Sequence, residues 1–204
     1  MNDLQFVLSR GNKIFFVRHS LAAPAAEGQE DFNRPLTQKG RELAKKTRKE
    51  IDLSKVVYVA YNPAIRCKET ADVLMDGLKT SRLSMPLAYG LHPDSPGREV
   101  IFPVFLQIRD SSLADYAKHG CAEAFTLHAT TILGYINSVL NDLPELYGDL
   151  MIVTHGTMAA ALALHLGQAL KFNTDEVMNF KPTECMVITV SKDGITCHDS
   201  QLVD

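Results

Sequence analysis

Short apolar runs alternate along this chain with longer segments whose apolar residues recur at helical spacing. Three continuous runs, at residues 13–18, 56–60 and 150–154, are rich in β-branched and aromatic side chains and predict buried strands. A short strand at 86–91 and a closing hairpin, 185–190 with 195–198, are predicted as well. The predicted helices cover residues 37–51 (with Thr37 as the N-cap), 63–78, 99–110, 122–143 and 156–170.

This alternation predicts the fold class. Strands that are apolar throughout and separated by helices are typical of a mainly parallel sheet covered on both faces, so we expect an α/β protein, a three-layer α/β/α sandwich. A chain of 204 residues is expected to form a single domain, 1–204. In such folds binding sites form at the carboxyl ends of the strands.

Basic residues stand at those strand ends. Arg18 and His19 follow the first strand, Arg66 lies just inside the helix after the second, and His155 follows the third. None of these three motifs contains a carboxylate. Guanidinium groups match phosphate oxygens in bidentate geometry, so the cluster is suited to a dianionic phosphoryl group. A histidine between two arginines should have a lowered pKa and stay neutral, which makes it a nucleophile.

Four segments resemble one known family. They are F-F-V-R-H-S at 15–20, R-P-L-T-Q-K-G at 34–40, Y-N-P-A-I-R-C-K-E-T-A at 61–71 and V-T-H-G at 153–156. Together they resemble the histidine phosphatase superfamily, and most closely its compact phosphohistidine phosphatase branch. The resemblance implies a phosphoglycerate mutase-like fold, with His19 as the phosphorylated nucleophile and no cofactor. It also implies that Arg18, Arg66 and His155 bind the phosphoryl group.

The chain departs from the family pattern in places that affect the chemistry. Ser20 stands where the family usually has glycine, and we expect it to narrow the loop or add a donor. The glutamate that serves mutases as the acid is missing, so Asp94 and Glu99 are the candidate general acids, with His92 behind them. A phosphohistidine substrate would relax the need for an acid, because imidazole leaves easily.

The composition restricts the possible binding partners and the cellular location of the protein. A net charge of −3 and a pI of about 6.2 argue against a nucleic-acid binder. The longest apolar runs are too short to cross a membrane, and the first residues do not resemble a signal peptide. Four cysteines without a C-x-x-C pair favour buried, reduced thiols and a cytoplasmic location, and no metal-ligand spacing is present. The oligomeric state stays open.

These features predict a metal-independent phosphatase that forms a phosphohistidine at His19. Its substrate would be a phosphorylated small molecule or a phosphoprotein, either as a phosphomonoester or as protein phosphohistidine. Two alternatives remain: a phosphomutase, and a phosphate-binding or phosphoprotein-binding module with weak or no catalytic activity.

Overall fold

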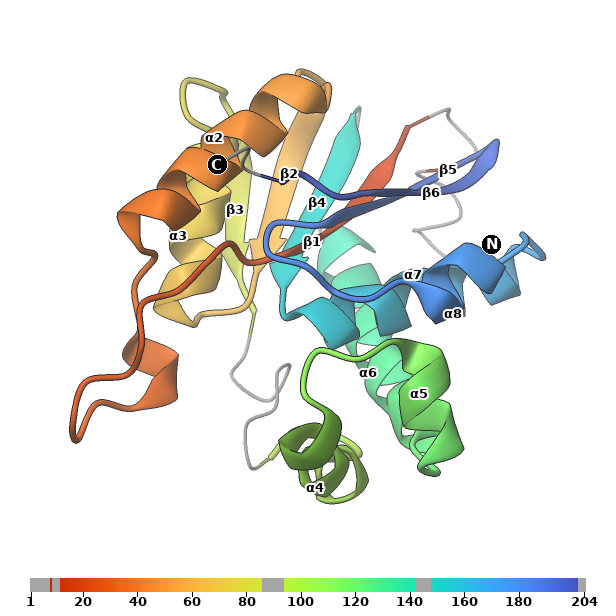
Figure 1. The fold of residues 1–204 in the computed structure, drawn as a ribbon. Helices are drawn as coiled ribbons and strands as arrows, with labels where there is room; N and C mark the ends of the chain where they lie inside the picture. The colour runs from red at the N-terminus through yellow and green to blue at the C-terminus, as the bar shows by residue number, and fades with distance from the viewer. Residues whose placement is uncertain (1–7, 9–11, 86–93, 142–147, 202–204) are drawn as a thin grey trace.

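The computed structural model describes residues 8, 12–85, 94–141 and 148–201, and its centre is one six-stranded sheet (Figure 1). The strands lie in the order β3-β2-β4-β1-β5-β6. The first four in that order pair parallel, β5 runs antiparallel to β1, and β6 runs antiparallel to β5. The strands are β1 (Ile14–Arg18), β2 (Val56–Tyr61), β3 (Ser81–Ser84), β4 (Asp149–Thr154), β5 (Val187–Ser191) and β6 (Gly194–His198).

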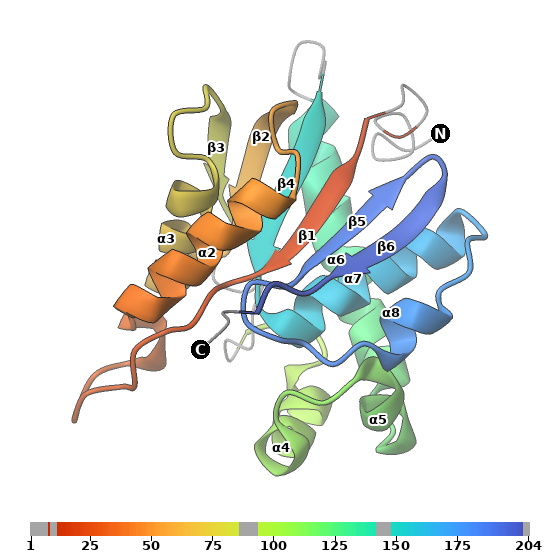
Figure 2. The same cartoon turned by 45° about the horizontal axis from the view of Figure 1, so that its top comes forward.

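Helices cover both faces of the sheet, which confirms the predicted three-layer α/β/α sandwich (Figure 2). One face carries α2 (Gln38–Glu50) and α3 (Ile65–Leu74), and the other carries α6 (Ala122–Asn141) and α7 (Gly156–Ala169). The remaining helices are η1 (Asp31–Asn33), α4 (Arg98–Ile108), α5 (Leu113–Lys118) and α8 (Asp175–Asn179).

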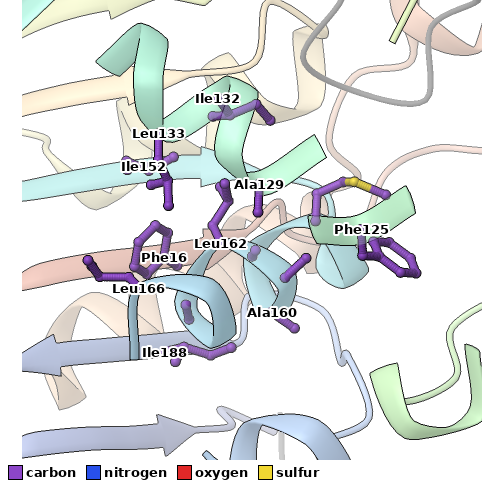
Figure 3. Packing of buried hydrophobic residues seen from close by; sticks show 14 of the residues in the cluster. Phe16, Phe125, Ala129, Ile132, Leu133, Ile152, Ala160, Leu162, Leu166 and Ile188 are labelled. Carbon is purple, nitrogen blue, oxygen red and sulfur yellow. The ribbon is translucent and has the colours of Figure 1, made fainter. Parts of the chain in front are cut away.

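The central strands β1 and β4 are apolar except at their ends because both of their faces are buried. Along β1, Ile14 and Phe16 pack toward α6 and α7, whereas Phe15 and Val17 pack toward α2 and α3. In β4, Ile152 joins Phe16 in the α6–α7 core, as Figure 3 shows. Neighbouring residues of a strand point to opposite faces, so a strand between two helical layers needs apolar side chains at every position.

The predicted major elements are present, with ends that differ by a few residues. Thr37 caps α2 as expected, and its hydroxyl accepts a hydrogen bond from the Gly40 amide at 2.9 Å. Four elements were not predicted, and one of them is the three-residue η1. The edge strand β3 has the polar sequence S-R-L-S, and α5 and α8 have only 6 and 5 residues, too few for a periodic pattern. The strand expected at 86–91 lies outside the described residues.

All four cysteines are free thiols, as expected. Cys67, Cys121 and Cys185 are buried, but Cys197 is only half-buried because it lies on the outermost strand, β6. Across the described part of the chain, none of the helices is both long enough and apolar enough to cross a membrane.

Candidate active site

The basic residues predicted at the strand ends meet in one pocket. Arg18 ends β1 and pairs in register with Thr154, which ends β4, so His19 and His155 follow side by side. The His19 amide extends the ladder by donating to the Thr154 carbonyl at 2.9 Å. Arg66, the second residue of α3, reaches the same place, and all four line a cavity of about 670 Å³.

Two hydrogen bonds fix the tautomer of His19. Its Nδ1 lies 2.8 Å from the Ser20 carbonyl oxygen, which can only accept, so Nδ1 carries the proton. Its Nε2 accepts a hydrogen bond from Nε of Arg66 at 3.2 Å. The ring also meets that of His155 edge to face, with centroids 5.3 Å apart and planes 81° apart. His19 therefore presents the Nε2 lone pair to the pocket.

Both histidines are held neutral. Burial is the main cause that brings the pKa of His19 well below its ordinary value, and the neighbouring His155 and Arg66 lower it further. Burial likewise lowers the pKa of His155 to about 3, with Arg66 and Arg18 adding to the effect. The predicted influence of the arginines is present, but desolvation is larger.

Hydrogen bonds from Ser20 to α3 and α2 hold the backbone that follows His19 in place. The buried Ser20 amide donates to the Thr70 hydroxyl at 2.9 Å, and that hydroxyl donates to the Arg66 carbonyl at 2.7 Å. The Ser20 hydroxyl donates to the Gly40 carbonyl at 2.7 Å. Ser20 therefore points away from the pocket and supplies the added donor, the second of the two expectations for this residue. Its side chain ties the His19 turn to α2.

Gly156 makes room for Arg18. A Cβ at this position would lie 2.8 Å from the Arg18 Cδ and 2.5 Å from the Pro182 Cβ, both too close. The guanidinium of Arg18 donates to the Pro182 carbonyl at 2.6 Å, and its side chain is 8% exposed. The glycine after His155 is therefore a packing requirement of the neighbouring arginine.

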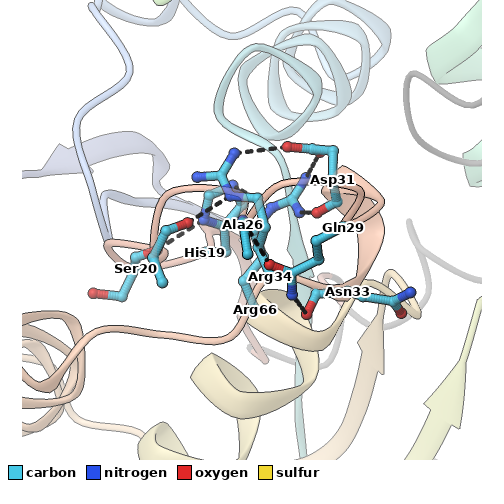
Figure 4. A network of polar contacts seen from close by, with 9 residues as sticks. His19, Ser20, Ala26, Gln29, Asp31, Asn33, Arg34 and Arg66 are labelled. Carbon is cyan, nitrogen blue, oxygen red and sulfur yellow. Dashed lines mark hydrogen bonds and ion pairs between the residues drawn. The ribbon is translucent and has the colours of Figure 1, made fainter.

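Carboxylates that the motifs do not contain reach the site from other segments. Asp31, on η1, bridges two arginines: one oxygen lies 2.7 Å from Arg66 and the other 2.6 Å from Arg34 (Figure 4). Because of these partners, the pKa of Asp31 is lowered even though its partial burial acts to raise it. At the opposite side, Arg18 pairs with Asp110 at 3.1 Å and Glu184 at 3.5 Å. The pocket thus balances its arginines with acidic side chains.

The chain was compared with family models, with curated protein sequences and with solved structures. Neither a scan against protein-family models nor a search of curated protein sequences gives a match. Solved structures do match over nearly the whole chain. The protein histidine phosphatase SixA complexed with tungstate is 15% identical, with 91% of this chain and 94% of that chain covered and a TM-score of 0.53.

Two further structures give the same result. Phosphoglycerate mutase from Bacillus anthracis has a TM-score of 0.54 at 15% identity, with 94% of this chain and 93% of that chain covered. The α-ribazole phosphatase from Shigella flexneri has a TM-score of 0.52 at 13% identity, covering 92% and 95%. This chain has the phosphoglycerate mutase-like fold. The predicted resemblance to the histidine phosphatase superfamily is confirmed in the fold.

The candidate general acids Asp94 and Glu99 do not line the pocket that holds His19. Asp94 and Glu99 are both exposed, and neither is among the residues that line the cavity. His92 lies outside the described residues. Asp110 and Glu184 do line the cavity, and no sequence motif pointed to them. Asn62 also lines the pocket, and its side chain accepts a hydrogen bond from the Ala64 amide at 3.0 Å, so it shapes the turn into α3.

Among the residues placed in the structure, no group of three or more His, Cys, Asp or Glu side chains is arranged to hold a metal ion. The donors that converge on the pocket are guanidinium and imidazole nitrogens. Such donors bind anions.

Proposed function

We propose that this chain is a metal-independent phosphatase that hydrolyses a phosphomonoester or protein phosphohistidine through a phosphohistidine at His19. The observation that carries the proposal is the double hydrogen bonding of His19. The Ser20 carbonyl holds the proton on Nδ1, and Arg66 contacts the Nε2 lone pair. A neutral, oriented imidazole next to anion-binding groups is equipped for nucleophilic attack on phosphorus.

The proposed reaction has two steps. Nε2 of His19 attacks phosphorus, a P–N bond forms, and the bond to the leaving group breaks with its electron pair on the departing atom. Water then attacks the phosphohistidine, the P–N bond breaks, inorganic phosphate leaves, and Nε2 recovers its lone pair. Arg18, Arg66 and His155 stabilise the charge on the equatorial oxygens, which is the main task of an enzyme in phosphoryl transfer.

Without substrate, acidic side chains occupy the guanidinium groups that would bind the phosphoryl group. Asp31 on Arg66 and Asp110 on Arg18 are both well exposed, with 65% and 53% of their side chains accessible. The guanidiniums they pair with are only 8% exposed, and a buried charge of this kind needs a partner of opposite sign. An arriving dianionic phosphoryl group can supply that partner in place of the carboxylates, which can turn out into solvent.

The similar folds support the same chemistry. The solved relatives include a protein histidine phosphatase, an α-ribazole phosphatase and a phosphoglycerate mutase, whose names all denote phosphoryl chemistry. The substrate of this chain is accordingly proposed as a phosphorylated small molecule or a phosphoprotein.

Hydrolysis of p-nitrophenyl phosphate in EDTA, from pH 5 to 8, tests the proposal. The nitrophenolate leaves without help, so a missing acid does not hide activity. We expect turnover by the wild type and none by His19→Ala. A His119→Ala control should keep the wild-type turnover, because His119 is exposed at the end of α5. Radiolabelled substrate should leave an acid-labile, base-stable label that His19→Ala lacks. Turnover retained in His19→Ala would refute the mechanism, and phosphate binding without turnover or label would favour a binding module.

A further inference from the structure

One face of α4 presents a regular row of side chains to the pocket. Arg98, Phe102 and Phe105 are spaced by four and three residues, so they lie along the same side of the helix, and Arg109 follows directly after its end. All four line the cavity. The two rings are 6.4 Å apart between centroids and inclined by 21°, and a guanidinium caps each end, 4.2 Å from the Phe102 centroid and 5.5 Å from that of Phe105. We call these four residues the aromatic row.

The rest of α4 holds this row in place. Ile101, on another side of the helix, is 1% exposed and belongs to the α6–α7 core. Gly97, which precedes the helix with φ 75°, lies so close to α6 that a Cβ would be 2.7 Å from the Ala124 carbonyl oxygen. The helix is thus fixed through its core side, while Phe102 and Phe105 stay half-buried toward the pocket.

The row lies where a leaving group would go. His19, Arg18 and His155 stand at the carboxyl ends of the strands, and Figure 1 shows α4 beyond those ends. In phosphoryl transfer the attacking and leaving atoms are roughly in line through phosphorus. A phosphoryl group attacked by Nε2 therefore directs its leaving group away from the strand ends and toward α4.

The chemistry of the row favours a flat, apolar partner. Aromatic rings pack against one another in offset or edge-to-face arrangements, an interaction that adds to simple burial of area. A guanidinium lies over one face of each ring and holds the ring in place, so the uncovered edges and faces of the two rings form the apolar wall. Leu106, 52% exposed, extends that wall along the cavity. A hydroxyl-rich leaving group would lose water here without finding hydrogen-bonding partners in the rings.

We propose that the aromatic row binds the leaving group, and that the chain prefers phosphomonoesters whose leaving group carries a planar aromatic ring. This inference rests on the proposed function, whose reaction places the leaving group there. Where the oxygen is bonded directly to the ring, the P–O bond breaks with the electron pair on a stabilised phenolate, which takes its proton from solvent. Such a substrate suits a pocket lined by neither Asp94 nor Glu99.

A matched pair of esters tests the proposal. Benzyl phosphate and cyclohexylmethyl phosphate have similar size and similarly poor alkoxide leaving groups, but only the first has a flat ring. We expect the wild type to favour the benzyl ester in kcat/KM by about three- to tenfold, the range of an aromatic pairing contribution. The double variant Phe102→Leu/Phe105→Leu should bring the ratio near one, chiefly by raising KM for the benzyl ester.

Two controls accompany the variant. Phe172→Leu removes another half-buried ring that does not line the cavity and should keep the wild-type ratio. Inhibition by inorganic phosphate should be unchanged in the double variant, because the phosphoryl-binding groups are intact. If the double variant does not fold, Phe102→Leu alone should still lower the ratio.

The outcomes separate this inference from the proposed function. Turnover of both esters with a wild-type ratio near one, or an equal ratio in wild type and variant, overturns the role of the row and leaves the phosphatase proposal standing. A row that serves instead to dock a protein would give this result. Absence of both turnover and phosphoenzyme in the wild type overturns the two proposals together.

Discussion

Replacing Thr70 with valine removes one hydroxyl behind the active site and nearly nothing else. Thr70 and Ser20 are both fully buried, and the Thr70 hydroxyl is the acceptor for the Ser20 amide at 2.9 Å. Valine has a similar shape but offers no acceptor, so the buried amide loses its partner. Leaving such a donor unsatisfied costs about 1–3 kcal/mol. The Arg66 carbonyl, which also loses a bond, lies within α3 and keeps the helical backbone as its partner.

The expected effect covers both stability and catalysis. Unfolding in urea should show a loss of about 1–3 kcal/mol with an unchanged slope, and melting should fall by about 2–4 °C for each kcal/mol. Since the Ser20 carbonyl holds the proton of His19 in place, a shifted Ser20 should also lower kcat for p-nitrophenyl phosphate at pH 7.

Two further variants isolate the cause. Thr126 makes the same hydroxyl-to-carbonyl bond within α6, at 3.0 Å to Ala122, but it is exposed. Thr126→Val should therefore stay within about 0.5 kcal/mol of the wild type. Thr70→Ser, which keeps the hydroxyl, should retain most of kcat. A Thr70→Val protein with wild-type urea midpoint and wild-type kcat would refute this account of the turn.

Three other predictions concern packing, pH and thiols. Gly156→Ala should displace Arg18, lower kcat/KM for p-nitrophenyl phosphate and destabilise by about 1–3 kcal/mol, as overpacking does, measured by kinetics and urea unfolding. Burial lowers the pKa of His155 to about 3 and of His128 to about 4, so below about pH 6.5 the unfolded chain binds more protons. Stability should then fall as pH drops from that value toward 3, seen as a declining urea midpoint, while kcat/KM shows no loss at pH 6.5 from protonation of His19. The pKa of each of the four thiols is raised, above all by burial, so a thiol reagent at pH 8 should label the native protein far more slowly than the unfolded chain.

The layers of the fold were predictable because the central strands carry their own signal. Every residue of β1 and β4 is buried, and apart from Arg18, Asp149 and Thr154 at their ends the two strands are apolar. The edge strand β3 is mostly exposed and polar, and its strand character comes from pairing with β2. Such a segment has no periodic pattern of its own.

In the candidate site, too, some residues were predictable from local sequence and others were not. His19, Arg18 and His155 were predictable because each directly ends a strand, and the fold brings strand ends together. Asp31, Asp110 and Glu184 come from connecting segments, whose course depends on tertiary packing and not on local pattern. Asp31 lies three residues before Arg34, in the long connection after His19, and that proximity to a basic motif was the one available signal.

The order of the strands in the sheet has a consequence for how the molecule is made. β1 and β4 are neighbours in the sheet although 136 residues separate Arg18 from Thr154. During synthesis, β1 and β2 emerge long before the strand that lies between them. Until β4 leaves the ribosome, β1 has no native partner strand and β2 has one only on its β3 edge, and unpaired edges of this kind invite aggregation. Folding should therefore be slow, limited by closure of this long loop, and His19 should gain its neighbour His155 only when the sheet closes.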